Sequence, residues 1–139
     1  MKKVVKSILA FEVLFGLFLL HSCSTPSSSQ ESNLPKSQGK LARIIFITTS
    51  KGCQCTLTRC IEAEKILQRV LKNYPNAPKV EKVDYAVEQT KAIYFVKKYS
   101  AMMLPILYLM DSKENLLWKK DGDFNEAELV DVLNKLGTK

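Results

Sequence analysis

Histidine is nearly absent from this chain, since His21 is the only one among 139 residues. A metal site built from several imidazole rings is therefore excluded. A stripe of basic and aromatic residues is missing as well, because the 21 lysines and arginines, which outnumber the 14 acidic residues, are spread along the sequence. We therefore expect a solvated basic surface and no nucleic-acid partner.

Long apolar runs are scarce too, and the longest lies at residues 7–20, after three lysines within the first six residues. This arrangement predicts a secretory signal peptide over residues 1–22. Its end, Leu20-His21-Ser22-Cys23, resembles a bacterial lipobox. The resemblance implies cleavage before Cys23, a lipid on its sulfur and an extracytoplasmic, membrane-anchored position in the cell envelope. Ser24 would favour the outer membrane, on its periplasmic side, in a Gram-negative cell.

The segment after the signal peptide differs sharply in composition from the rest of the chain. Residues 23–39 are rich in serine and proline and have almost no apolar content. Such a segment buries too little surface to fold, so we expect a flexible tether between the lipid and a domain. Residues 40–139 are long enough for one small domain with its own core.

Three cysteines of that domain fall within eight residues: Cys53, Cys55 and Cys60. They lie between an apolar run typical of a buried strand and a segment with helical periodicity. At such a junction the backbone N–H groups and the positive end of the helix dipole stabilise a thiolate. With His21 removed and Cys23 lipidated, these thiols have no histidine partner, so a Cys–His catalytic pair is excluded.

The apolar periodicity alternates between strand and helix along the domain. Asn125 is a candidate N-cap for the last helix, and residues 111–115 are expected to form a hairpin turn. This order predicts an α/β domain with a mixed sheet of about four strands and helices on both faces. We expect strands at residues 41–48, 80–85, 106–110 and 116–120, and helices at residues 57–74, at residues 87–99 and from Asn125 onward.

The segment from Leu104 to Asp111, followed by a turn, Trp118, Gly122 and a helix, resembles the thioredoxin-like family. The order of elements resembles this family across residues 40–139. The resemblance implies that Pro105 has a cis peptide bond and faces the active-site cysteines. The family's Cys-x-x-Cys motif is missing here, and Cys-x-Cys with a third cysteine after four residues stands in its place.

The pairing of the three cysteines depends on where the helix begins. If Thr56 is the N-cap, Cys55 and Cys60 occupy the two positions of the hydrophobic staple, which touch. Cys55 and Cys60 are then the expected disulfide, and Cys53 remains free. A Cys53–Cys55 bridge is the alternative, which would be strained and more oxidising. The three thiols are also able to act in relay.

Three functions are compatible with these residues. The first is thiol–disulfide exchange through Cys53, Cys55 and Cys60 beside Pro105, without a cofactor, on protein thiols or disulfides or on a redox partner in the cell envelope. The second is binding of a soft metal such as Cu(I) or Zn(II) by the three thiolates. The third is a non-catalytic interaction domain with one structural disulfide.

Two methionines and one tryptophan are the remaining candidates for contact with a ligand. Met102 and Met103 precede Pro105 and are candidates to line a substrate groove, although methionine also fills loops and cores. Trp118 is expected to pack rather than to bind a ligand.

Overall fold

The computed structural model describes residues 39–138 of the chain. The predicted signal peptide, the lipidation site Cys23 and the tether up to residue 38 lie outside these described residues. Among residues 39–138, no helix is both long and apolar enough to cross a membrane.

Four strands form one mixed sheet. They are β1 (Arg43–Thr48), β2 (Val80–Asp84), β3 (Ile106–Met110) and β4 (Leu116–Asp121), arranged in the order β2-β1-β3-β4. Strand β1 runs parallel to β2 and antiparallel to β3, and β3 is antiparallel to β4. The two central strands are almost entirely apolar because both of their faces are covered.

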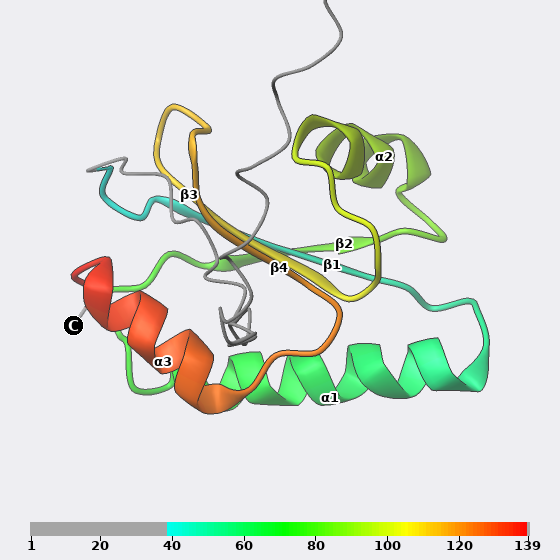
Figure 1. Ribbon diagram of the computed structural model, residues 1–139, viewed down its shortest axis with the longest axis horizontal. Helices are drawn as coiled ribbons and strands as arrows, with labels where there is room; N and C mark the ends of the chain where they lie inside the picture. Colours follow the sequence, from blue (N-terminus) through cyan, green and yellow to red (C-terminus); the bar gives the residue numbers. More distant parts are fainter. Residues whose placement is uncertain (1–38, 139) are drawn as a thin grey trace, which may run out of the picture. The chain divides into compact units, whose positions relative to one another are not determined.

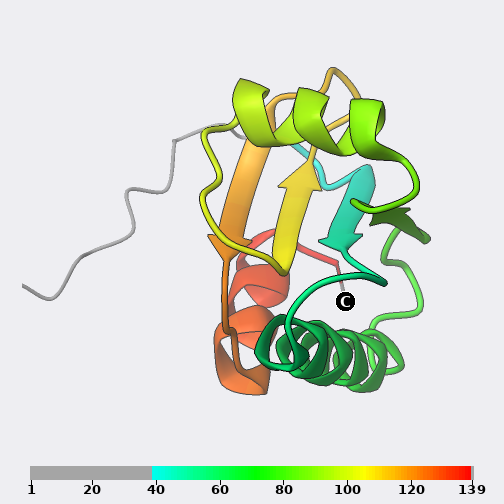
Figure 2. The ribbon, with the colours of Figure 1, turned by 90° about the vertical axis from the view of Figure 1, so that its right-hand side faces the viewer.

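Three helices cover the sheet: α1 (Gln54–Leu71), α2 (Gln89–Lys98) and α3 (Glu126–Lys135). Helices α1 and α3 lie on one face and α2 lies on the other (Figures 1 and 2). The predicted α/β architecture, with about four strands and helices on both faces, is therefore confirmed.

Alternate side chains of the central strands build two separate cores. Phe46 and Leu107 belong to the core under α1 and α3, whereas Ile45 and Tyr108 belong to the core under α2. Each fully buried side chain of this size contributes roughly 1.5–3 kcal/mol to folding. Trp118 is buried in the first core, so its expected packing role is confirmed.

The predicted start of α1 was wrong. The helix begins at Gln54, three residues earlier than expected, because Cys53 rather than Thr56 is its N-cap. The Cys53 Sγ accepts a hydrogen bond from the Thr56 N–H at 3.4 Å. The start of α3 was predicted correctly, since the Asn125 side chain accepts from the Glu128 N–H at 2.9 Å.

Two predicted features of the segment around β3 are confirmed. The Leu104–Pro105 peptide bond is cis. The turn between β3 and β4 is held by Asp111, whose Oδ1 accepts from the backbone N–H groups of Lys113 at 2.8 Å and Asn115 at 2.9 Å.

Candidate redox site

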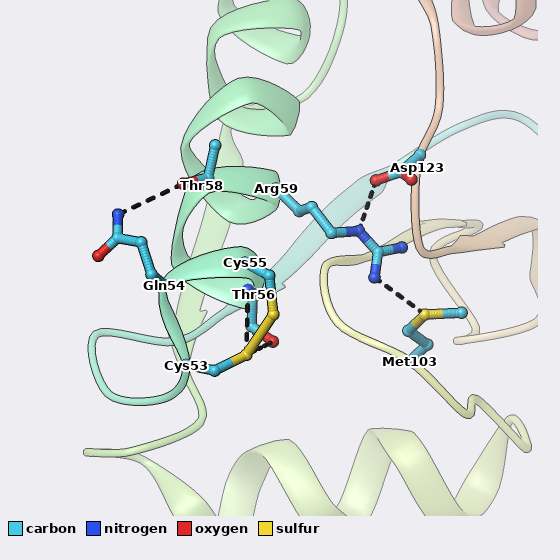
Figure 3. The surroundings of a disulfide bond; sticks show 8 residues. All are labelled: Cys53, Gln54, Cys55, Thr56, Thr58, Arg59, Met103 and Asp123. Carbon is cyan, nitrogen blue, oxygen red and sulfur yellow. Dashed lines mark hydrogen bonds and ion pairs between the residues drawn. A yellow bond between two sulfur atoms is a disulfide. The ribbon is translucent and has the colours of Figure 1, made fainter.

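Cys53 and Cys55 form a disulfide at the start of α1 (Figure 3). Their Cα atoms are 5.4 Å apart, within the range that a disulfide spans. Both residues are exposed. A thiol from another molecule can therefore reach the bond without unfolding the domain.

The predicted Cys55–Cys60 pair was wrong. Because α1 already begins at Gln54, Cys55 and Cys60 both lie within the helix, five residues apart. Five residues turn an α-helix through about 500°, so the two side chains point roughly 140° apart. Cys60 is a free thiol that is only 2% exposed and faces the domain interior. Cys53, which we expected to be free, is one of the paired cysteines.

The environment of Cys53 favours negative charge on its sulfur. Besides the Thr56 N–H, the Thr56 hydroxyl lies 3.2 Å from the Cys53 Sγ. The first turn of α1 carries no acidic residue that would oppose the positive end of the helix dipole. Groups of this kind stabilise a thiolate, so we expect a reactive Cys53 when the disulfide is reduced.

The loop that leads from β1 to Cys53 is anchored at the end of β2. The Ser50 N–H donates to Asp84 Oδ1 at 3.1 Å, and the Ala86 N–H donates to the same oxygen at 2.8 Å. The hydrogen bond from Ser50, assisted by the one from Ala86, lowers the pKa of Asp84. Gly52 has a φ of +156°, which places the turn into Cys53 in a region that side chains disfavour.

Arg59 connects α1 to two other loops near the disulfide (Figure 3). Its Nε donates to Asp123 Oδ1 at 2.7 Å, and its Nη1 lies 3.1 Å from the Sδ of Met103. Met103 precedes the cis Pro105 by two residues, and Pro105 itself is buried. Sequence reasoning did not predict these contacts of Arg59. The available signal was the position of Arg59 four residues after Cys55, on the same face of the helix.

No family model and no curated protein matches this chain. Solved structures do resemble it. Thioredoxin-2 of the malaria parasite is 20% identical with a TM-score of 0.54, covering 70% of this chain and 84% of its own. An uncharacterized thioredoxin-like protein from Clostridium perfringens is 21% identical with a TM-score of 0.52, covering 81% of this chain and 93% of its own. Chloroplastic thioredoxin z is 13% identical with a TM-score of 0.51, covering 69% of this chain and 78% of its own.

This chain has the thioredoxin-like fold. At these identities the similarity establishes the fold and not the activity. The thioredoxin-like domain differs from the family's Cys-x-x-Cys pattern in that one residue, Gln54, separates its paired cysteines.

The described part of the thioredoxin-like domain does not assemble the metal site considered from sequence. Within residues 39–138, no group of three or more histidine, cysteine or acidic side chains is placed to hold a metal ion. The sulfurs of Cys53 and Cys55 are bonded to each other, and Cys60 is buried. Cys60 instead borders a shallow cleft of about 300 Å³, whose wall includes Glu64 and Lys82.

Proposed function

We propose that this thioredoxin-like domain carries out thiol–disulfide exchange with protein substrates through Cys53 and Cys55. The observation that carries the proposal is an exposed disulfide in which the Cys53 sulfur caps the N-terminus of α1. Accessibility and a stabilised thiolate are the two properties that exchange requires.

The proposed exchange proceeds in two steps. In the reduced protein, the Cys53 thiolate attacks one sulfur of a substrate disulfide, forming a mixed disulfide and releasing the other substrate sulfur as a thiolate. The Cys55 thiol then loses its proton to solvent and attacks the Cys53 sulfur. This forms the Cys53–Cys55 bond and releases the second substrate thiolate. Two electrons pass from the protein dithiol to the substrate, and a dithiol reductant restores the starting state.

A purely structural role for this disulfide is disfavoured by its position. Cross-linking stabilises a fold mainly by restricting the unfolded chain, and the restriction grows with the length of the loop that is closed. Cys53 and Cys55 are two positions apart, so the closed loop is as short as a Cys-x-Cys pair permits. The expected contribution is roughly 1.5 kcal/mol, small for a bond that is also exposed.

The test combines turnover with trapping. The reduced wild-type chain should accelerate the reduction of insulin disulfides by dithiothreitol. The Cys55→Ser variant should accumulate a mixed disulfide with glutathione on Cys53 when treated with oxidised glutathione. Mass spectrometry of peptides locates the adduct. No acceleration by the wild type, together with equal and slow labelling of every thiol, would sink the proposal.

We also propose that the domain acts outside the cytoplasm, anchored by a lipid on Cys23. The support is the Leu20–Cys23 motif, the serine- and proline-rich tether, and an exposed disulfide, which persists in oxidising compartments. The full chain, expressed in a bacterium, should incorporate radiolabelled palmitate and partition into the detergent phase. The Cys23→Ser variant should do neither. Equal labelling of both proteins would refute the anchor and leave the exchange chemistry untouched.

A further inference from the structure

Arg59 joins three segments of the domain at one point. It belongs to α1, one helical turn after Cys55, and it contacts Asp123 in the loop between β4 and α3. It also contacts the sulfur of Met103 in the loop before β3. Figure 3 shows the side chain extending from the helix toward these two residues. The two residues are 44 and 64 positions away from Arg59 in sequence, so both contacts are tertiary ones.

The two loops that Arg59 reaches are also bound to each other. The Gly122 N–H donates to the carbonyl of Met103 at 3.1 Å and to that of Pro105 at 2.8 Å. Gly122 has a φ of +77°, and a Cβ at this position would lie only 3.1 Å from Arg59 Nη2. The positive φ therefore favours glycine, and the guanidinium group of Arg59 lies close against it. Arg59 is therefore in close contact with both loops.

The loop held by this contact is exposed and apolar. Met102 is 92% exposed and Met103 is 49% exposed. Adjacent exposed apolar side chains favour contact with a partner molecule. Backbone hydrogen bonds tie this loop to Gly122, and the side chain of Arg59 ties it to α1.

We infer that Arg59 is a positioning residue for protein substrates. It holds the Met103 loop against the helix that carries Cys53 and Cys55, so that loop and disulfide together present one contact surface. This inference rests on the proposed exchange function. The carboxylate of Asp123, 2.7 Å from the guanidinium group, offsets part of its charge, so we expect Arg59 to act through its position rather than through charge on the sulfurs.

Loss of the Arg59 contacts should impair reaction with a protein substrate more than reaction with a small disulfide. Arg59→Gln should raise the KM for insulin about threefold to tenfold, the range expected for losing one or two partly exposed contacts. Its kcat for insulin, and its rate constant with oxidised glutathione, should stay within about a factor of two of the wild type. Glutathione is small and needs the cysteines but not the extended surface.

The chain offers a matched control. Arg69 lies farther along the same helix and pairs with Glu126 at the start of α3, away from the disulfide. Arg69→Gln removes an arginine and a tertiary ion pair of the same kind, and should leave both substrates unaffected. Arg59→Lys keeps the charge but loses the planar group that contacts Asp123 and Met103 together, so it should resemble Arg59→Gln.

A measurement without turnover tests the positioning itself. In protein labelled with [methyl-13C]methionine, the Met103 methyl signal should shift toward its unfolded position in Arg59→Gln and stay unchanged in Arg69→Gln. An unchanged Met103 signal, or an unchanged KM with an active wild type, would overturn this inference and leave the proposed function standing. An equal loss of rate with insulin and glutathione would also overturn it, because Arg59 would then act on the cysteines. A wild type inactive with both substrates would overturn the proposed function.

Discussion

The first and second turns of α1 carry cysteines in opposite circumstances. Cys53 and Cys55 are exposed at the helix N-terminus and bonded to each other, whereas Cys60 is buried and free. All three lie within eight residues. Position on the helix, and not the number of thiols nearby, therefore decides which sulfur a reagent can reach.

The physical contrast has two parts. At the N-terminus of α1, backbone N–H groups and the helix dipole favour a thiolate, and the two sulfurs there are exposed to solvent. Farther along the helix, Cys60 is only 2% exposed, so a partner cannot reach its sulfur in the folded domain. It therefore behaves as a small apolar residue of the core.

The largest expected effect comes from removing the exposed sulfur of Cys53. Cys53→Ser should lower the rate of insulin reduction at least about 100-fold, because the attacking thiolate is lost. The free energy of unfolding should fall by no more than roughly 1.5 kcal/mol, the worth of so short a cross-link. Turnover assays and urea denaturation under oxidising conditions measure the two effects. A variant that stays active but unfolds easily would reverse the roles assigned here.

The buried sulfur should give the opposite result. Cys60→Ser places a hydroxyl in a site 2% exposed and should lower the free energy of unfolding by about 1–3 kcal/mol. Insulin reduction at a temperature where the variant is folded should remain within a factor of about two. Cys60→Ala, which adds no polar group, is the control and should cost about 1 kcal/mol. If Cys60→Ala abolishes exchange, a three-thiol relay would replace the two-thiol account.

The sequence was sufficient to predict most of the fold. Apolar runs predicted the four strands, helical periodicity predicted the three helices, and the Asn125 cap predicted the start of α3. These features are local, so they can be read from neighbouring residues. The cis peptide bond before Pro105 was also predicted, from the thioredoxin-like resemblance of the segment around it.

The details of the site were harder to predict because they depend on one helix boundary. The capping preference of threonine suggested that α1 begins after Thr56. Cys53 is the N-cap instead, so Cys55 and Cys60 lie on different sides of one helix. The contact of Arg59 with Met103 and Asp123 joins distant segments, and no local pattern encodes it.

A smaller effect should distinguish the groups that stabilise Cys53. Thr56→Val removes the hydroxyl 3.2 Å from the sulfur but keeps the backbone N–H. The Cys53 thiolate should lose one hydrogen-bond donor, and alkylation of Cys53 by iodoacetamide at pH 7 should slow about threefold. Thr56→Ser keeps the hydroxyl and should match the wild type. Identical rates for all three proteins would mean that the helix N-terminus alone activates the thiol.

The smallest expected effect concerns Asp84, which anchors the loop leading to Cys53 and lines the cleft beside Cys60. The hydrogen bond from Ser50 lowers its pKa below the ordinary value of 3.8. Its contribution to stability is therefore present above about pH 4 and is lost as the pH falls through the lower folded-state pKa. Asp84→Asn, which keeps an acceptor oxygen, should be slightly less stable than the wild type at about pH 6, and the difference should shrink as the pH falls below about 4. Thermal denaturation across this range would show the change. A gap that widens on acidification would contradict the sign of this shift.

The most direct test is to equilibrate the wild-type chain with mixtures of reduced and oxidised glutathione and to map every thiol by mass spectrometry. We predict that Cys53 and Cys55 convert together between dithiol and disulfide, with any glutathione adduct on Cys53. Cys60 should remain a free thiol at every ratio. A disulfide that joins Cys60 to Cys53 or to Cys55 in the folded protein would contradict the account.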